Sequence, residues 1–283
     1  MEIIERAPAK INLTLNVLGK RNDGFHEMRM IMTSIDLSDR LTLTSKEQDE
    51  ITLSCNAAFI PLNKKNIVYQ AARLLKETYG IQAGIHIAIE KKIPVAAGLG
   101  GGSSDAAATL RGLNRLWALD LSLEKLAELG EKIGSDVPFC VYGKTAFATG
   151  KGEIIQLIND FPKCWVIVVK PPKGISSWTV FEELDLMSIP RYDHQRMIEA
   201  INANDYEEVV QYAGNALEEI STQQQPTIKR IKDKMESFGV DVAVMSGTGP
   251  TVYGLTRQRS KAQRIVNGLK GFCKEVYLVR TLN

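Results

Sequence analysis

The stretch PVAAGLGGGSSDAA, residues 94–107, carries the densest chemical signal in the sequence, because it places four glycines in five positions. Glycine costs about 1 kcal/mol relative to alanine in regular structure, so this density indicates that a ligand or another backbone must approach closely. A glycine-rich loop that leads into a helix points free N–H groups at one place, and the helix dipole adds about half a positive charge there. We therefore predict a phosphate-binding loop.

Two standard phosphate motifs do not match this loop. It lacks the GK[ST] of a Walker A loop, and in the G-x-G-x-x-G register Ser103 occupies the last glycine position. A flexible hinge or a tight crossover between two elements stays open as a structural explanation of the glycines.

Asp105 follows the loop, in what we expect to be the first turn of a helix capped by Ser103 or Ser104. A carboxylate there complements the helix dipole. Beside bound phosphates it would be repulsive unless Mg²⁺ lay between them. The sequence leaves both roles open and does not identify the Mg²⁺ ligands.

Lys10 and Asp136 are the two side chains that would complete a phosphoryl-transfer site. Lys10 lies next to an alternating apolar stretch, and Asp136 stands in GSDVP, between a helix end and Pro138. Taken singly, each is more often a solvated surface group. Beside bound phosphates, catalysis depends mainly on positioning and on neutralising charge. Asp136 would orient the attacking hydroxyl and accept its proton late, while Lys10 would keep Asp136 ionised and stabilise charge near the attacking oxygen.

A second glycine-rich turn, MSGTGPTVYGL at residues 245–255, separates two predicted strands near the C-terminus. It is either a tight hairpin or a turn that faces the first loop and closes over phosphates or substrate.

Apolar periodicity indicates the elements that must position these residues. Residues 11–17 alternate with the period of a half-buried strand, which puts Lys10 and Asn12 on its polar face. NDGF at 22–25 is typical of a turn. The other elements predicted before residue 150 are strands near 40–44, 51–55 and 84–90, helices at 66–79, 104–117 and 122–133 (the last ending at Gly134), and extended structure over 137–149.

The second half has the β-α-β-β-α-β order of ferredoxin-like domains, with extra helix. Turn residues cluster at 150–163, so we predict an α+β chain of two domains, 1–155 and 156–283, with a cleft between them. The elements predicted here are strand 164–170, helical patterns at 195–219 and 226–238, strands 241–246 and 251–256, helix 260–270 and strand 275–280.

Composition limits the class of protein. The chain has 283 residues, 44% hydrophobic and 24% charged, with a net charge of +2. Such a balance is typical of a globular protein and does not indicate a nucleic-acid binder. Neither a membrane span nor a signal-peptide core is apparent, so we expect a cytoplasmic protein without a membrane partner. Four scattered cysteines are expected to be reduced thiols: Cys55, Cys140, Cys164 and Cys273.

The motifs, in their order, resemble those of the GHMP kinases, the family of galactokinase, homoserine kinase, mevalonate kinase and phosphomevalonate kinase. APAKINLTLNV is similar to the first motif, PVAAGLGGGSSDAA to the central one and SGTGPTVYGL to the third. NDGFHEM and GSDVPFC narrow the resemblance to the branch that phosphorylates the 2-hydroxyl of diphosphocytidyl-methylerythritol in the non-mevalonate isoprenoid route. The resemblance covers nearly the whole chain. It implies ATP and Mg²⁺ as cofactors, a ribosomal S5 domain 2-like N-terminal domain and a ferredoxin-like C-terminal domain.

The resemblance also implies site residues. Lys10 and Asp136 match the family's catalytic lysine and aspartate, and Asn66, opening a helix, is expected to contact the adenosine. The ATP-binding segment carried over comprises Pro94, Val95, Ala96, Ala97, Gly98, Leu99, Gly100, Gly101, Gly102, Ser103 and Ser104.

Substrate binding is implied for a second group. Phe25 and His26 match the pair that recognises cytosine in these kinases, although tyrosine is usual at position 25, so the stacking face is kept and a hydroxyl is lost. A second aromatic is expected from Phe181 or Trp178, and Phe181 is favoured. Asn12 is expected near the substrate phosphates or hydroxyls. Gly247 and Gly249 of the third motif are also expected to bind substrate. The remaining histidines, His86 and His194, are expected to be solvated.

Two other hypotheses of function compete with this one. A GHMP kinase for another small alcohol would keep the phosphate loop, but His26 after the DG turn favours a substrate that carries a cytidine group. A nucleotide-binding regulator without catalysis is disfavoured because both Lys10 and Asp136 are present. The sequence gives no indication of the oligomeric state.

Overall fold

The computed structural model describes residues 1–282, and its chain divides into two compact units. Unit 1 comprises residues 1–9, 37–95 and 100–143, and unit 2 comprises residues 10–36, 96–99 and the chain from 144 onward. The units interleave along the sequence because two long strands, β1 (Glu2–Lys20) and β2 (His26–Lys46), contribute residues to both. The boundary expected after residue 155 stays a prediction.

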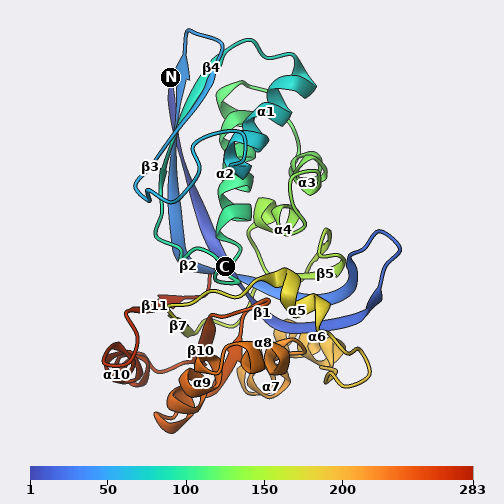
Figure 1. The fold of residues 1–283 in the computed structure, drawn as a ribbon, viewed down its shortest axis with the longest axis vertical. Coiled ribbons are helices and arrows are strands. Elements are labelled where there is room, and N and C mark those ends of the chain that lie inside the picture. The colour runs from blue at the N-terminus through green and yellow to red at the C-terminus, as the bar shows by residue number, and fades with distance from the viewer. Residues whose placement is uncertain (283) are drawn as a thin grey trace. The chain divides into compact units, whose positions relative to one another are not determined.

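Unit 1 is a sheet covered by helices. Strand β4 (Gly84–Glu90) pairs antiparallel with residues 40–46 of β2 and parallel with β3 (Ile51–Cys55). Helices α1 (Ile67–Tyr79) and α2 (Gly101–Leu116) lie side by side against this sheet, as Figure 1 shows. Helices α3 (Leu123–Glu131) and α4 (Val137–Tyr142) complete the unit.

Unit 2 contains two groups of strands. In the first, residues 28–32 of β2 pair antiparallel with β5 (Ala146–Gly150), which pairs with β6 (Ile154–Leu157), and β1 pairs parallel with the short β8 (Gly214–Asn215). The second is a four-stranded antiparallel sheet in the order β11-β7-β10-β9. Its strands are β7 (Trp165–Lys170), β9 (Val242–Met245), β10 (Val252–Thr256) and β11 (Glu275–Arg280).

The β-α-β-β-α-β order predicted for the C-terminal half is confirmed. Helices α9 (Thr227–Ser237) and α10 (Arg259–Lys270) pack on one side of this sheet (Figure 1). The extra helices precede α9, and they are α5 (Ser177–Glu182), α6 (His194–Asn202), α7 (Tyr206–Tyr212) and α8 (Glu218–Gln224). No helix within residues 1–282 combines the length and apolar character needed to cross a bilayer.

The start of α2 corrects the predicted helix 104–117. The helix begins at Gly101, and neither Ser103 nor Ser104 is its N-cap. Gly100 takes that position with φ +67°, a left-handed conformation that glycine adopts without steric cost. Asp105 therefore lies beyond the first turn, and the prediction that it complements the dipole there is wrong.

Three other predicted elements differ from the structure. Helix α3 ends at Glu131 rather than at Gly134. The apolar run from residue 137 is the short buried helix α4, with a proline in its first turn, and only from residue 146 is the chain a strand. The helical pattern at 195–219 is broken into α6, α7 and the start of α8, because Asp205 caps a new helix through its side chain and residues 214–215 form β8.

Candidate active site

Lys10 lies in unit 2 on β1, where only 4% of its surface is exposed. Its Nζ donates to Asn12 Oδ1 at 2.7 Å, and its backbone N–H donates to the Leu99 carbonyl at 2.9 Å. Asn12 is fully buried, and its Nδ2 donates to Met30 Sδ at 3.4 Å. Asn12 thus orients the lysine, and a direct contact between Asn12 and substrate stays a prediction.

The two glycine-rich turns pack against each other within unit 2. A Cβ on Gly98 (φ +72°) would lie 2.1 Å from the Ser246 carbonyl oxygen, and Ser246 Oγ donates to the Gly98 carbonyl at 2.9 Å. A Cβ on Gly247 would lie 3.1 Å from the Gly98 oxygen and 3.5 Å from Lys10 Nζ. The backbone of the second turn therefore accounts for the glycine at position 98, and three separate motifs meet beside Lys10.

Both glycine-rich turns contain residues with a positive φ. Ala96 has φ +51°, a left-handed conformation that costs a non-glycine residue about 1 kcal/mol or more. Gly249, in the second turn, has φ +82°, and a Cβ there would lie 2.6 Å from Met245 Sδ. A non-glycine residue such as Ala96 keeps this conformation only where the surrounding structure enforces it, and such residues cluster at functional sites.

The N-terminus of α2 in unit 1 offers donors to an anion. Helix α2 has sixteen residues, and Gly100, its N-cap, makes no side-chain capping bond. Its first N–H groups are thus left for a ligand or solvent. Gly102 is exposed and Ser103 half-exposed, whereas Ser104 is buried and its hydroxyl donates to the Pro8 carbonyl at 2.7 Å. Of the two serines, Ser103 is the more open to solvent, and its contact with a phosphate oxygen stays a prediction.

Asp105 does not fit the role of a Mg²⁺ ligand. Its Oδ2 accepts from Lys91 Nζ at 2.7 Å, and the same ammonium contacts Asp39. A lysine thus already occupies the position of a cation between these two carboxylates. Residues 1–282 contain no group of three His, Cys, Asp or Glu side chains that could hold a metal ion.

Asp136 and Asn66 both stand at helix starts in unit 1. Asp136 is the N-cap of α4, and Arg111 on α2 holds the other end of that helix by donating to the Cys140 carbonyl at 2.7 Å. Asn66 caps α1: its Oδ1 accepts from the Val68 N–H at 2.9 Å and its Nδ2 donates to the Pro61 carbonyl at 2.7 Å. Its polar atoms are thus occupied, and a contact with adenosine stays a prediction.

The residues predicted to recognise cytosine lie together in unit 2. The rings of His26 and Phe181 stack with centroids 4.8 Å apart and an interplanar angle of 18°. Burial, helped by Lys20, lowers the pKa of His26, so at neutral pH its ring has one donor and one acceptor nitrogen. Phe25 is 54% exposed with Lys151 Nζ 5.4 Å from its ring centre, and Trp178 is 74% exposed.

The other two histidines, expected to be solvated, are only partly so. His86 is half-buried between Thr52 Oγ1 (2.9 Å from Nδ1) and Ser54 Oγ (3.0 Å from Nε2). His194 is half-buried and stacks on Phe147 with centroids 5.2 Å apart. Cross-strand hydroxyls and an aromatic partner distant in sequence supply these contacts, which alternation alone does not reveal.

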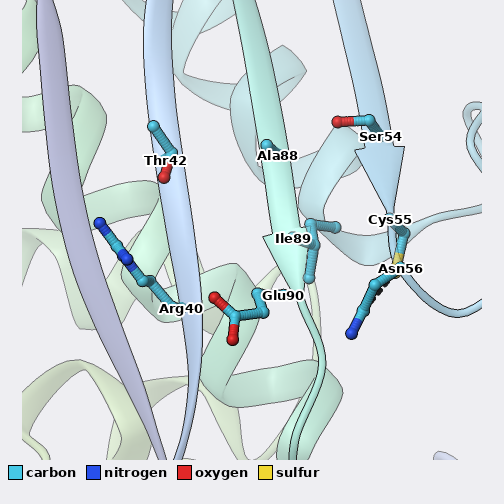
Figure 2. Close-up of a pocket in the computed structure, with 8 residues that line it drawn as sticks. All are labelled: Arg40, Thr42, Ser54, Cys55, Asn56, Ala88, Ile89 and Glu90. Carbon is cyan, nitrogen blue, oxygen red and sulfur yellow. Dashed lines mark hydrogen bonds between the residues drawn. The ribbon is translucent and has the colours of Figure 1, made fainter.

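A hollow of about 440 Å³ lies on the sheet of unit 1. Figure 2 shows that its side chains come from β2, β4 and β3, with Arg40 and Glu90 projecting from neighbouring strands. Its lining mixes charged, hydroxyl and small apolar groups and includes none of the predicted site residues.

Sequence reasoning missed two sets of residues in unit 1. Asp39 and Lys91 form a buried charge network with Asp105, and Arg111 supports α4. Lysines and aspartates are usually solvated, so type and spacing gave no signal. The one cue for Lys91 was its position three residues before the glycine segment.

Comparison with protein families confirms the class that these motifs indicated. The model of the GHMP kinases N terminal domain matches residues 66–144, and the GHMP kinases C terminal model matches residues 197–275. The chain therefore belongs to the GHMP kinases, a family of small-molecule kinases, and has the fold predicted for it.

Individual similar proteins are named more specifically than the family models. The 4-diphosphocytidyl-2-C-methyl-D-erythritol kinase of Bacillus pumilus (strain SAFR-032) is 55% identical over 282 residues, covering 100% of this chain and 98% of that protein. The enzyme of the same name from Bacillus subtilis (strain 168) is 54% identical with the same coverage. A crystal structure of 4-(cytidine 5'-diphospho)-2C-methyl-D-erythritol kinase matches with a TM-score of 0.84 and 29% identity, covering 100% of both chains. Homoserine kinase from Cytophaga hutchinsonii shares the fold, with a TM-score of 0.77, 18% identity and coverage of 98% of this chain and 94% of that one.

Proposed function

We propose that this protein transfers the γ-phosphate of ATP to the 2-hydroxyl of 4-diphosphocytidyl-2-C-methyl-D-erythritol, a step of the non-mevalonate isoprenoid route. The observation that carries the proposal is full-length identity of 53–55% to kinases that bear this name. Within unit 2, the stacked His26 and Phe181 support a cytidine ligand, since histidine can both donate to and accept from a base edge. Because its phosphate donor is ATP, the proposal includes a cytoplasmic location.

The phosphate-binding part of the proposal rests on segment 94–104 and on the N-terminus of α2. Its backbone N–H groups and the Ser103 hydroxyl would receive the ATP phosphates, with the helix dipole favouring their negative charge. The turn containing Gly247 and Gly249, packed against Gly98, would border the transferred phosphate or the substrate. Mg²⁺ would supply further charge neutralisation, and Asp105 would not hold it because Lys91 takes that place.

The chemical step would use Lys10 and Asp136. The substrate hydroxyl oxygen forms a bond to the γ-phosphorus while the bond from that phosphorus to the ADP oxygen breaks, and the hydroxyl proton passes to the Asp136 carboxylate. A carboxylate is a much weaker base than an alkoxide, so the proton moves late, once the new bond has begun to form. Lys10, oriented by Asn12, would stabilise negative charge near the attacking oxygen.

The test is an ADP-release assay with ATP, Mg²⁺ and the diphosphocytidyl compound, run beside galactose, homoserine and mevalonate. We expect turnover on the cytidine compound alone. Asp136→Asn is expected to fold and bind ATP normally but to lose at least about a hundredfold in kcat, in line with removal of a positioned acid–base group.

Activity on another alcohol only would reassign the substrate while keeping the kinase. ATP binding without turnover on any of the four would instead favour a nucleotide-binding regulator. Near-wild-type turnover of Asp136→Asn would remove that residue from the mechanism.

A further inference from the structure

Three buried charged side chains of unit 1 form one network beside the glycine segment. Lys91 contributes the ammonium, and its side chain is 8% exposed; those of Asp39 and Asp105 are 0% and 6% exposed. Lys91 Nζ donates to Asp105 Oδ2 at 2.7 Å and also to Asp39 Oδ2. The two carboxylates thus share a single cation away from solvent.

The network joins the two ends of the glycine segment. At the entrance, Asp39 Oδ1 accepts from the backbone N–H groups of Lys92 and Ile93, the latter at 2.8 Å. At the exit, Asp105 lies on α2 directly after Ser104. The Lys91 side chain therefore connects the chain just before the glycine segment to α2, the helix that follows the segment.

The ammonium also lies beneath the first residue of α2. A Cβ on Gly101 would be 3.5 Å from Lys91 Nζ and 3.0 Å from Ile93 Cγ2. A cation near a helix N-terminus is unfavourable on its own, and the two carboxylates compensate for it there. The first turn of α2 and the segment entrance thus rest on the same charged group.

The charge balance makes the network sensitive to the loss of any member. Burial raises the pKa of Asp105, the Lys91 ammonium opposes this by favouring the ionised form, and Asp39 acts in the same direction as burial. Asp105 Oδ1 has no hydrogen-bond partner among residues 1–282. Removing the ammonium would leave two buried carboxyl groups without a counter-ion, which is far costlier than losing an exposed ion pair.

We propose that Asp39, Lys91 and Asp105 are positioning residues that hold the glycine segment, residues 94–104, in the conformation that receives the ATP phosphates. The inference rests on the proposed function for the identity of the ligand, but the anchoring itself requires no ligand. None of the three need touch substrate; they act through the backbone at each end of the segment.

The experiment compares Lys91→Met with the wild-type protein by two measurements made below the melting temperature of each. The first is hydrogen exchange of peptides covering residues 94–104, and the second is the ATP dissociation constant. We expect faster exchange in that segment and at least tenfold weaker ATP binding, with the KM for the alcohol substrate little changed. Asp105→Asn, which keeps the shape of the side chain, is the milder variant if Lys91→Met does not fold.

Two controls separate positioning from general destabilisation. Lys261→Met removes a partly buried ion pair of unit 2, in which Lys261 Nζ lies 2.7 Å from Asp241 Oδ1, and should leave exchange of 94–104 and ATP affinity unchanged. The neutral triple variant Asp39→Asn/Lys91→Met/Asp105→Asn should recover melting temperature relative to Lys91→Met, because no buried charge remains, but not ATP affinity.

Unchanged exchange and ATP affinity in Lys91→Met would overturn the inference, as would recovery of ATP affinity together with melting temperature in the triple variant. If the wild-type protein binds no ATP, the proposed function fails and the ligand named here fails with it. The exchange measurement then still decides whether the network holds the segment.

Discussion

At the scale of single residues, the stacked pair of His26 and Phe181 is the feature most specific to the proposed substrate. We expect His26→Ala to raise the KM for the cytidine compound about five- to thirtyfold, the equivalent of about 1–2 kcal/mol for lost stacking and a hydrogen bond. The KM for ATP should stay within about twofold, because His26 belongs to the predicted cytosine contacts alone. Steady-state kinetics with each substrate varied in turn provide the measurement.

The structure supplies a matched control for this variant. His194 stacks on Phe147 in the same unit, with an interplanar angle of 3°, but is not among the predicted substrate residues. His194→Ala should therefore remove a comparable aromatic contact and leave both KM values near wild type. An equal rise in both KM values for His26→Ala would make His26 a structural residue.

At the scale of elements, the interlocking glycine turns explain why side chains are excluded at position 98. We expect Gly98→Ala to lose stability and at least tenfold in kcat/KM, because its Cβ would meet the Ser246 carbonyl at 2.1 Å in a backbone with φ +72°. Gly80 has a similar φ, +65°, but open space around the Cβ of a Gly80→Ala variant. This variant should cost about 1 kcal/mol of unfolding free energy and leave kcat/KM unchanged. Similar kinetics for the two variants would rule out close backbone approach as the reason for the glycine.

Elements with strong periodicity were predictable from the sequence, and those decided by backbone conformation were not. Alternation over 11–17 located β1, and the order of strands and helices after residue 164 identified the ferredoxin-like sheet. The start of α2 was misplaced because its cap is Gly100 in a left-handed conformation, where a serine cap was the usual expectation. The residues of the short helix α4 suggest extended structure, because a run of buried apolar residues has no period of its own.

The candidate site likewise contains residues that the sequence predicts and residues that it does not. Motif order indicated Lys10, the glycine turns and His26, and the structure brings Lys10 beside both turns and His26 against Phe181. The Asp39–Lys91–Asp105 network was not predictable, because Asp39 lies 52 residues from Lys91 in sequence and only the fold joins them.

At the scale of the whole molecule, the interleaving of the units means that the sheet β11-β7-β10-β9 depends on the N-terminal strands. In unit 2, Gly254 faces Met235 of α9, so Tyr253 faces the opposite side of the sheet. Tyr253 is fully buried there, and its hydroxyl donates to the Asn12 carbonyl at 2.8 Å. Leu282 is held in the same way, since its N–H donates to the Ser34 carbonyl at 2.9 Å.

A fragment of residues 156–283 should therefore fail to fold alone, although its element order is that of an independent ferredoxin-like domain. Without residues 10–36 the Tyr253 face is exposed to water and β8 loses its pairing partner, β1. Burying a large apolar side chain contributes about 1.5–3 kcal/mol, so exposing several of them exceeds the stability of a typical domain of this size. We expect poor chemical-shift dispersion in its NMR spectrum and no cooperative urea transition, with both restored when residues 1–155 are co-expressed. A dispersed spectrum from the isolated fragment would show that the C-terminal sheet is stable without β1 and β2, and would support a domain boundary after residue 155.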